Sequence, residues 1–181
     1  MLIKILSILA ALVALFMIFV ATRPAQFRIS RSAVISAPPA TVFALVNDFH
    51  RWEGWSPWAK LDPNVKNTFE GPASGKGAVF AWAGNNQVGE GRMTITESRP
   101  SELVLIRLDF FKPFAAVNTT EFKFTPQAGG TMVSWTMSGE NKFIGKLMSF
   151  VFNCDKMVGG QFGKGLAQMK SIAEGGAGRP A

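Results

Sequence analysis

The chain has 181 residues, of which 48% are apolar and 17% charged, so it is long enough for one well-buried domain and too short for two comfortable ones. A single cysteine, Cys154, excludes an internal disulfide and any cysteine-rich metal site. The formal net charge of +7 predicts an affinity for anionic surfaces. Because the basic residues are scattered and form no recognised motif, the expected partner is membrane lipid and not nucleic acid.

Residues 2–22, LIKILSILAALVALFMIFVAT, carry one charge, Lys4, and match the roughly 20 apolar residues that cross a bilayer as a helix. The sequence that follows offers no convincing small-x-small cleavage site. We therefore predict a transmembrane anchor at 1–23 and a linker at 24–26, in a single-pass protein expected in a bacterial inner membrane. The arginines within residues 23–31 nearly cancel the orienting effect of Lys4 and the amino terminus, which leaves the side of the soluble domain open.

The segment after the linker, FRISRSAVI at residues 27–35, is rich in β-branched residues and predicts a strand. Next, SAPPATVFALVNDF predicts a helix with Ser36 as a candidate N-cap and two prolines in its first turn. HRWEGWSPW then places three tryptophans at three-residue steps beside the only histidine, His50. Gly54 and Pro57 punctuate this segment, which predicts a second short helix or a structured loop. The tryptophans could build core, the rim of a cavity or an element that touches the membrane.

Residues 65–138 alternate apolar and polar positions between turns, which is typical of an antiparallel sheet. ELVLIRLDFF, for example, places Arg107 and Asp109 on the face opposite its apolar residues, and TTEFKFTP alternates in the same way. GNNQ is a hairpin signal, because Gly and Asn tolerate a positive φ. One face of the predicted sheet is therefore apolar and rich in aromatic residues.

Residues 141–174 repeat apolar positions at spacings of mainly three and four, which predicts one long amphipathic helix. The glycines between 159 and 165 are expected to weaken or bend its middle, since each costs about 1 kcal/mol relative to alanine. The lysines on its polar face are either solvated or rest on anionic lipid headgroups. Residues 175–181 are expected to form a disordered tail.

These elements predict an α+β fold in which a curved antiparallel sheet of about seven strands wraps around a long C-terminal helix, preceded by one transmembrane helix. A curved sheet that grips a single helix leaves space between them, and such spaces commonly bind apolar ligands.

Three segments, ISAPPATVFALVNDFHRWEGWSPW, GEGRMTITESRP and TMVSWTMSGENKFIGKLM, resemble the polyketide cyclase/dehydrase and lipid-transport families of the SRPBCC (START-like, Bet v1-like) superfamily. The resemblance covers residues 27–174. It implies a helix-grip fold whose internal cavity holds a hydrophobic small molecule, such as a lipid, a sterol-like compound or an aromatic polyketide. The superfamily contains binders, carriers, cyclases, dioxygenase subunits and chaperone activators, so the fold does not choose among these functions.

The predicted ligand-binding residues are apolar or aromatic and lie on the sheet face or on the tryptophan and C-terminal helical segments. They are Trp55, Trp58, Phe80, Trp82, Met93, Ile106, Leu108, Phe122, Phe124, Trp135, Leu147 and Val151.

Catalytic candidates are few. His50 has no partners at the spacing of a triad or of a histidine metal site, so it could act only as a single acid or base. Glu90 is a second candidate for moving a proton. No metal and no cofactor is expected. The sequence therefore predicts membrane-tethered binding, extending to transport, of a lipid-like or polyketide-like molecule. A cyclase or dehydrase enzyme and a non-catalytic interaction or stress-response module with a protein partner are the two alternatives.

Overall fold

The computed structural model describes residues 2–143, 145–147 and 153–176. Its helical elements are α1 (Leu2–Thr22), α2 (Pro39–Asn47), the 3₁₀ turn η1 (Phe49–Arg51), α3 (Trp52–Trp55) and α5 (Cys154–Gly176). Its strands are β1 (Gln26–Ile35), β2 (Lys66–Glu70), β3 (Val79–Ala83), β4 (Glu90–Arg99), β5 (Leu103–Lys112), β6 (Ala116–Gln127) and β7 (Gly130–Glu140).

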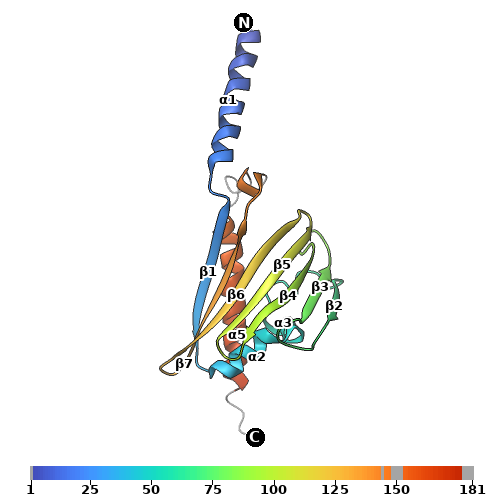
Figure 1. The fold of residues 1–181 in the computed structure, drawn as a ribbon, viewed down its shortest axis with the longest axis vertical. Helices are drawn as coiled ribbons and strands as arrows, with labels where there is room; N and C mark the ends of the chain where they lie inside the picture. Colours follow the sequence, from blue (N-terminus) through green and yellow to red (C-terminus); the bar gives the residue numbers. More distant parts are fainter. Residues whose placement is uncertain (1, 144, 148–152, 177–181) are drawn as a thin grey trace.

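The strands form one seven-stranded sheet in the order β1-β7-β6-β5-β4-β3-β2, and every neighbouring pair is antiparallel. The sheet curves around α5, which packs mainly on β1, while α2 packs on β5 and β6 (Figure 1). A register shift between Ile95 and Glu97 interrupts the β4–β5 ladder, and such irregularities increase local twist. The predicted α+β helix-grip architecture is confirmed.

Alternation along the strands separates an apolar inner face from a polar outer face. On the inner face Trp135 pairs with Phe122, which pairs with Val104 in the next strand, and all three are buried. On the outer face Ser30 and Thr136 share a hydrogen bond of 2.8 Å between their hydroxyls. The core therefore lies on the side of the sheet that faces α2 and α5.

Helix α2 begins differently from the sequence prediction. Pro38 occupies the N-cap position, and no side chain caps the helix. Ser36 is not the cap: its backbone N–H instead donates to Oε1 of Glu174 near the end of α5, at 2.7 Å. The proline at N1 supplies a φ already suited to a helix and has no N–H to satisfy, so the missing side-chain cap is less costly here.

The C-terminal helix is shorter than predicted and is interrupted at a different place. Residues 145–147 are helical, but Asn153 is not, and α5 starts after it. The side-chain oxygen of Asn153 accepts the backbone N–H of Lys156 at 2.9 Å, which is an N-cap. The glycines within 159–165 do not interrupt the helix.

Gly175 and Gly176, predicted to be tail, lie within α5. Residues 177–181 and the predicted lining residue Val151 lie outside the described residues.

Helix α1 extends away from the end of the domain at which β1 begins, and the last turn of α5 lies at the opposite end (Figure 1). The helix is long and apolar enough to cross a membrane, and nearly all of its side chains are exposed in the isolated chain. At its last turn Nζ of Lys146 donates to the carbonyl oxygen of Ala21 at 2.9 Å. A cation at this end also complements the helix dipole.

Candidate ligand-binding site

The tryptophan segment is held against α2 by indole hydrogen bonds. Trp52 Nε1 donates to the carbonyl oxygen of Val46, and Trp55 Nε1 donates to that of Leu45, both at 2.9 Å. Both tryptophans are buried, and their ring centroids lie 4.6 Å apart. Each indole N–H thus has an acceptor in the nearby helix α2, while the apolar part of the ring enters the interior.

Trp135 is the centre of an aromatic cluster between the sheet and α5. Its ring stacks on Phe162 of α5 with centroids 4.2 Å apart, and it lies 4.8 Å from Phe122 and 5.8 Å from Trp58. Trp55 approaches the same ring at 5.5 Å. Three other predicted ligand-binding residues, Trp55, Trp58 and Phe122, therefore contact Trp135, and side chains fill this half of the interior.

A glycine brings α5 close to this cluster. A methyl group at Gly165 would lie 2.8 Å from Cζ3 of Trp135 and 3.1 Å from Cδ of Pro57. Since such distances are too short for carbon atoms, only glycine lets the helix approach the indole this closely. Phe162 lies on the apolar stripe predicted for the C-terminal helix, but it is not among the predicted ligand-binding residues.

The indole Nε1 of Trp135 is buried and has no hydrogen-bond partner among the described residues. A buried N–H without an acceptor costs roughly 1–3 kcal/mol, so such groups are uncommon and need an explanation. A ligand oxygen or an ordered water in the interior would satisfy it.

Two further polar side chains point into the grip, which is the space between the inner face of the sheet and α5. Asn118 and Thr120 alternate with exposed residues along β6 and are 8% and 4% exposed, and their side chains form no hydrogen bond with another described residue. Their cross-strand neighbours on the inner face are Leu108 on β5 and Met137 on β7. The result is an apolar wall that carries isolated polar groups.

The sequence contained the signal for these two residues. In NTTEFKF they share one face with Phe122, which was selected, because positions two apart in a strand lie on the same side. Asn118 and Thr120 were not predicted as ligand-binding residues because only apolar and aromatic side chains were considered for that wall.

The remaining predicted lining residues divide into a buried group and a half-buried group. Met93, Ile106 and Leu108 are buried on the inner face of β4 and β5. Phe124 is also buried and contacts Phe43 of α2, whereas Leu147 is half-buried.

Phe80 and Trp82 are half-buried on β3, and their rings stack with centroids 5.9 Å apart. Trp82 Nε1 donates to the carbonyl oxygen of Val88 at 3.0 Å. Its ring lies over Gly91 of β4, where an added methyl group would come within 2.5 Å of the indole. Phe110 meets the same indole edge-on, so these rings continue the apolar wall toward the edge of the sheet.

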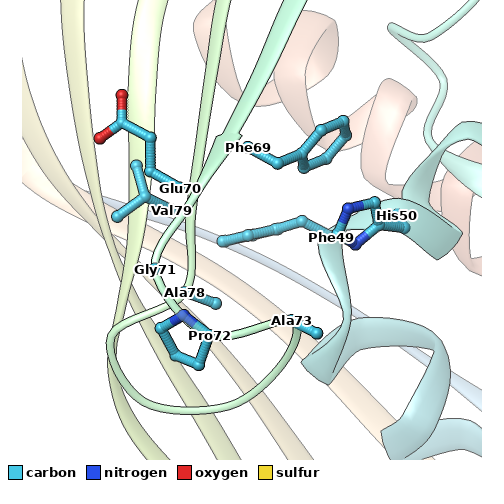
Figure 2. A pocket seen from close by; sticks show the side chains of 9 residues that line it. All are labelled: Phe49, His50, Phe69, Glu70, Gly71, Pro72, Ala73, Ala78 and Val79. Atoms are coloured by element: carbon cyan, nitrogen blue, oxygen red, sulfur yellow. The ribbon is translucent and has the colours of Figure 1, made fainter.

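The two catalytic candidates are not brought together. His50 lies at a pocket of about 260 Å³ between η1 and the β2–β3 hairpin, where its ring stacks on Phe69 at 4.1 Å (Figure 2). Its Nδ1 is 2.9 Å from Oδ1 of Asp48. Glu90 instead accepts from Nζ of Lys112 at 2.7 Å, at the start of β4. Neither residue faces the other across a common space.

The pocket at His50 is lined by Phe49, His50, Phe69, Glu70, Gly71, Pro72, Ala73, Ala78 and Val79. Figure 2 shows the rings of Phe49, Phe69 and His50 together on one side of the strands and the side chains of Glu70 and Val79 on the other. Among the residues that the structure describes, no three His, Cys, Asp or Glu side chains gather as a metal site would require.

An ion pair joins the start of α5 to β1. The guanidinium of Arg31 donates to both carboxylate oxygens of Asp155, at 2.8 and 3.1 Å, and to the Asp155 carbonyl oxygen at 3.0 Å. Hydrogen bonding to Arg31 lowers the pKa of Asp155, against a smaller opposing effect of desolvation. A methyl group at Gly159, one turn further along α5, would collide with the guanidinium unless the Arg31 side chain shifted.

Known structures share this fold at low sequence identity. Protein CV1439 from Chromobacterium violaceum aligns over 84% of this chain and 99% of its own, with a TM-score of 0.56 and 16% identity. The Aha1 dimer protein from Colwellia psychrerythraea aligns over 82% of this chain and 96% of its own, with a TM-score of 0.58 and 16% identity.

The di-domain ARO/CYC StfQ from the steffimycin biosynthetic pathway aligns over 86% of this chain, with a TM-score of 0.65 and 14% identity, and the match spans 53% of the StfQ chain. No curated protein matches the chain in sequence. Residues 26–174 match the family described as polyketide cyclase / dehydrase and lipid transport. Nearly the whole chain after α1 lies within that match, and the protein therefore belongs to this family.

Proposed function

We propose that the protein binds a hydrophobic small molecule, lipid-like or polyketide-like, in the half of the grip nearer to α1, and that α1 tethers this binding domain to a membrane. The observation that carries the proposal is a set of inner-face polar groups without a hydrogen-bond partner in the protein: the side chains of Asn118 and Thr120, and the indole N–H of Trp135 at the neighbouring aromatic cluster. A ligand with an apolar body and one or two polar groups matches this wall.

The energetics favour such a ligand. Each methylene group transferred from water into the apolar wall contributes about 0.8 kcal/mol, so a lipid-sized body supplies most of the affinity. Hydrogen bonds to the polar groups of this wall contribute less net energy but select a ligand by the position of its oxygens. Leu108 opposite Asn118 and Met137 opposite Thr120 provide the apolar part of this arrangement.

The tether is supported by the length and composition of α1 and by the short connection that follows it. Only residues 23–25 separate α1 from β1, so the domain would stay next to the bilayer that α1 spans. Loading from that membrane, and transfer of the ligand onward, would then require no long path through water.

An enzymatic role is less well supported by the geometry. A general acid or base must lie within hydrogen-bond reach of the reacting group. Glu90 is paired with Lys112, and His50 lies at a separate pocket beside β2, away from Asn118 and Thr120 on β6.

Native mass spectrometry of the full chain released from lipid nanodiscs tests the proposal. We expect a bound molecule that survives delipidation, and we expect Thr120→Leu, which removes a polar group and fills space, to lower its occupancy by about fivefold. Thr119→Leu is the matched control, because Thr119 is the next residue on the exposed face of β6. An empty wild-type protein that takes up no apolar probe, or equal occupancy in both variants, would refute the site.

A second candidate function is a non-catalytic interaction domain. The aromatic cluster around Trp135 and Phe162 favours it, because that half of the interior is already occupied by side chains. An empty protein in the experiment above would move the interpretation to this candidate.

A further inference from the structure

The tip of the β5–β6 hairpin lies at the end of the sheet from which α1 departs. Gln26, the first residue of β1, pairs with Glu140 of β7, and the preceding residue of β7, Gly139, pairs with Asn118 of β6. β6 starts just before Asn118, so the turn 113–115 extends beyond this same end (Figure 1). The strand register therefore places the β5–β6 tip at the same end of the sheet as the start of β1.

The tip exposes large apolar side chains. Phe111, Phe114 and Val117 are 54%, 65% and 56% exposed, although they lie within seven residues of one another. Two turns at the opposite end of the sheet, 100–102 and 128–129, carry only Pro, Ser, Glu, Ala and Gly. Single exposed apolar residues are ordinary, but a cluster at one end of a domain usually marks an interaction site.

Basic residues accompany this apolar cluster. Lys112 is exposed within the tip, Arg23 follows α1 directly, and Lys142 and Lys146 follow β7 at the same end. Cations next to apolar side chains match the boundary between anionic headgroups and acyl chains, where each lysine near the surface adds about 1 kcal/mol of attraction.

We infer that the β5–β6 tip, residues 111–117, inserts into the headgroup boundary of the bilayer that α1 spans. The domain would then have two attachments to an anionic phospholipid membrane and a fixed tilt on its surface. The inference rests on the proposed tether. It goes beyond that tether by assigning a second lipid-contacting element, at the end of the sheet that also carries Asn118.

Fluorescence quenching by bromine on lipid acyl chains tests this docking. The full chain carrying Cys154→Ser is reconstituted into vesicles of phosphatidylglycerol and phosphatidylcholine with brominated acyl chains. A small apolar fluorophore is attached at Phe114→Cys or, as the matched control, at Ala128→Cys in the exposed turn at the far end. A third label at Leu12→Cys in α1 reports membrane insertion of the anchor.

We expect the label at position 114 to be quenched roughly threefold more than the label at position 128. Adding Phe111→Ser should reduce the quenching at position 114 by about half, because this change removes apolar area from the tip. Circular dichroism of each variant checks that the fold is retained.

Equal quenching at positions 114 and 128, with strong quenching at position 12, would overturn the docking and leave the tether intact. That result would point to a protein partner for the tip. Absence of quenching at position 12 would overturn the tether, and the docking with it. An empty wild-type protein, or equal occupancy in the Thr120→Leu and Thr119→Leu variants, would change neither outcome, so the two proposals fail separately.

Discussion

Replacing Gly165 by alanine tests whether close contact between α5 and the aromatic cluster determines the stability of the domain. The new methyl group would lie 2.8 Å from Cζ3 of Trp135 and 3.1 Å from Cδ of Pro57, so the ring or the helix must shift. Overpacking of this kind costs about 1–3 kcal/mol. Alanine favours the helix by about 1 kcal/mol over glycine, so Gly165→Ala should lower the free energy of unfolding by about 0–2 kcal/mol.

Gly163→Ala is the matched control two residues away. A methyl group there meets nothing within 4 Å, and the position is also inside α5. It should raise the free energy of unfolding by up to about 1 kcal/mol through helix propensity alone. The two variants should therefore differ by about 1–3 kcal/mol, since propensity cancels and only the overpacking term remains.

Urea unfolding of the full chain in detergent, followed by tryptophan fluorescence, measures this difference. Equal stability of the Gly165→Ala and Gly163→Ala variants would refute the reasoning, because it would mean that α5 is free to move away from Trp135. A change in the denaturant slope would indicate an altered compactness and not a simple loss of stability.

Two further predictions concern packing and charge. Phe162→Ala should lower the free energy of unfolding by about 3–5 kcal/mol, because Phe162 is 2% exposed and stacks on Trp135. Phe114→Ala, at an exposed position, should change it by no more than about 0.5 kcal/mol. Urea unfolding compares the two variants, and similar effects would contradict the assigned burial. Because its partner Arg31 lowers the pKa of Asp155 in the folded state, the pair stabilises the fold above the ordinary pKa of an aspartate and loses this effect as the pH falls through the lowered pKa. Asp155→Asn should therefore make unfolding less dependent on acidic pH than in the wild type, and parallel pH profiles would contradict the role of the pair.

The sheet and its helix could be predicted from local pattern, because each strand carries its own alternation. In β5 the residues at 104, 106 and 108 are buried while Arg107 is exposed, as its sequence indicates. The hairpin turns and the short helices around Trp52 were likewise visible, since Gly, Asn and Pro restrict the backbone locally.

Features that depend on distant partners could not be predicted in the same way. The start of α5 depends on whether Asn153 turns its side chain back onto Lys156, and the amphipathic spacing does not report this choice. Ser36 had the right residue type for a cap, but Glu174, which lies far away in sequence, binds its N–H. The glycines of α5 looked like weak points, yet Gly165 is a site of close packing, because its neighbour Trp135 comes from another element.

The arrangement of the inner face bears on how a ligand would enter. The aromatic cluster closes the half of the grip around Phe162, and Arg31 holds the start of α5 on β1 through Asp155. The polar groups of Asn118 and Thr120 lie instead on the first residues of β6, next to the exposed tip and the exit of α1. A lipid leaving a bilayer through water would lose about 0.8 kcal/mol for each methylene exposed, so an entrance at the membrane surface avoids the largest barrier to loading. The proposed docking would therefore account for the occurrence of these inner-face polar side chains and the exposed phenylalanines at one end of the sheet.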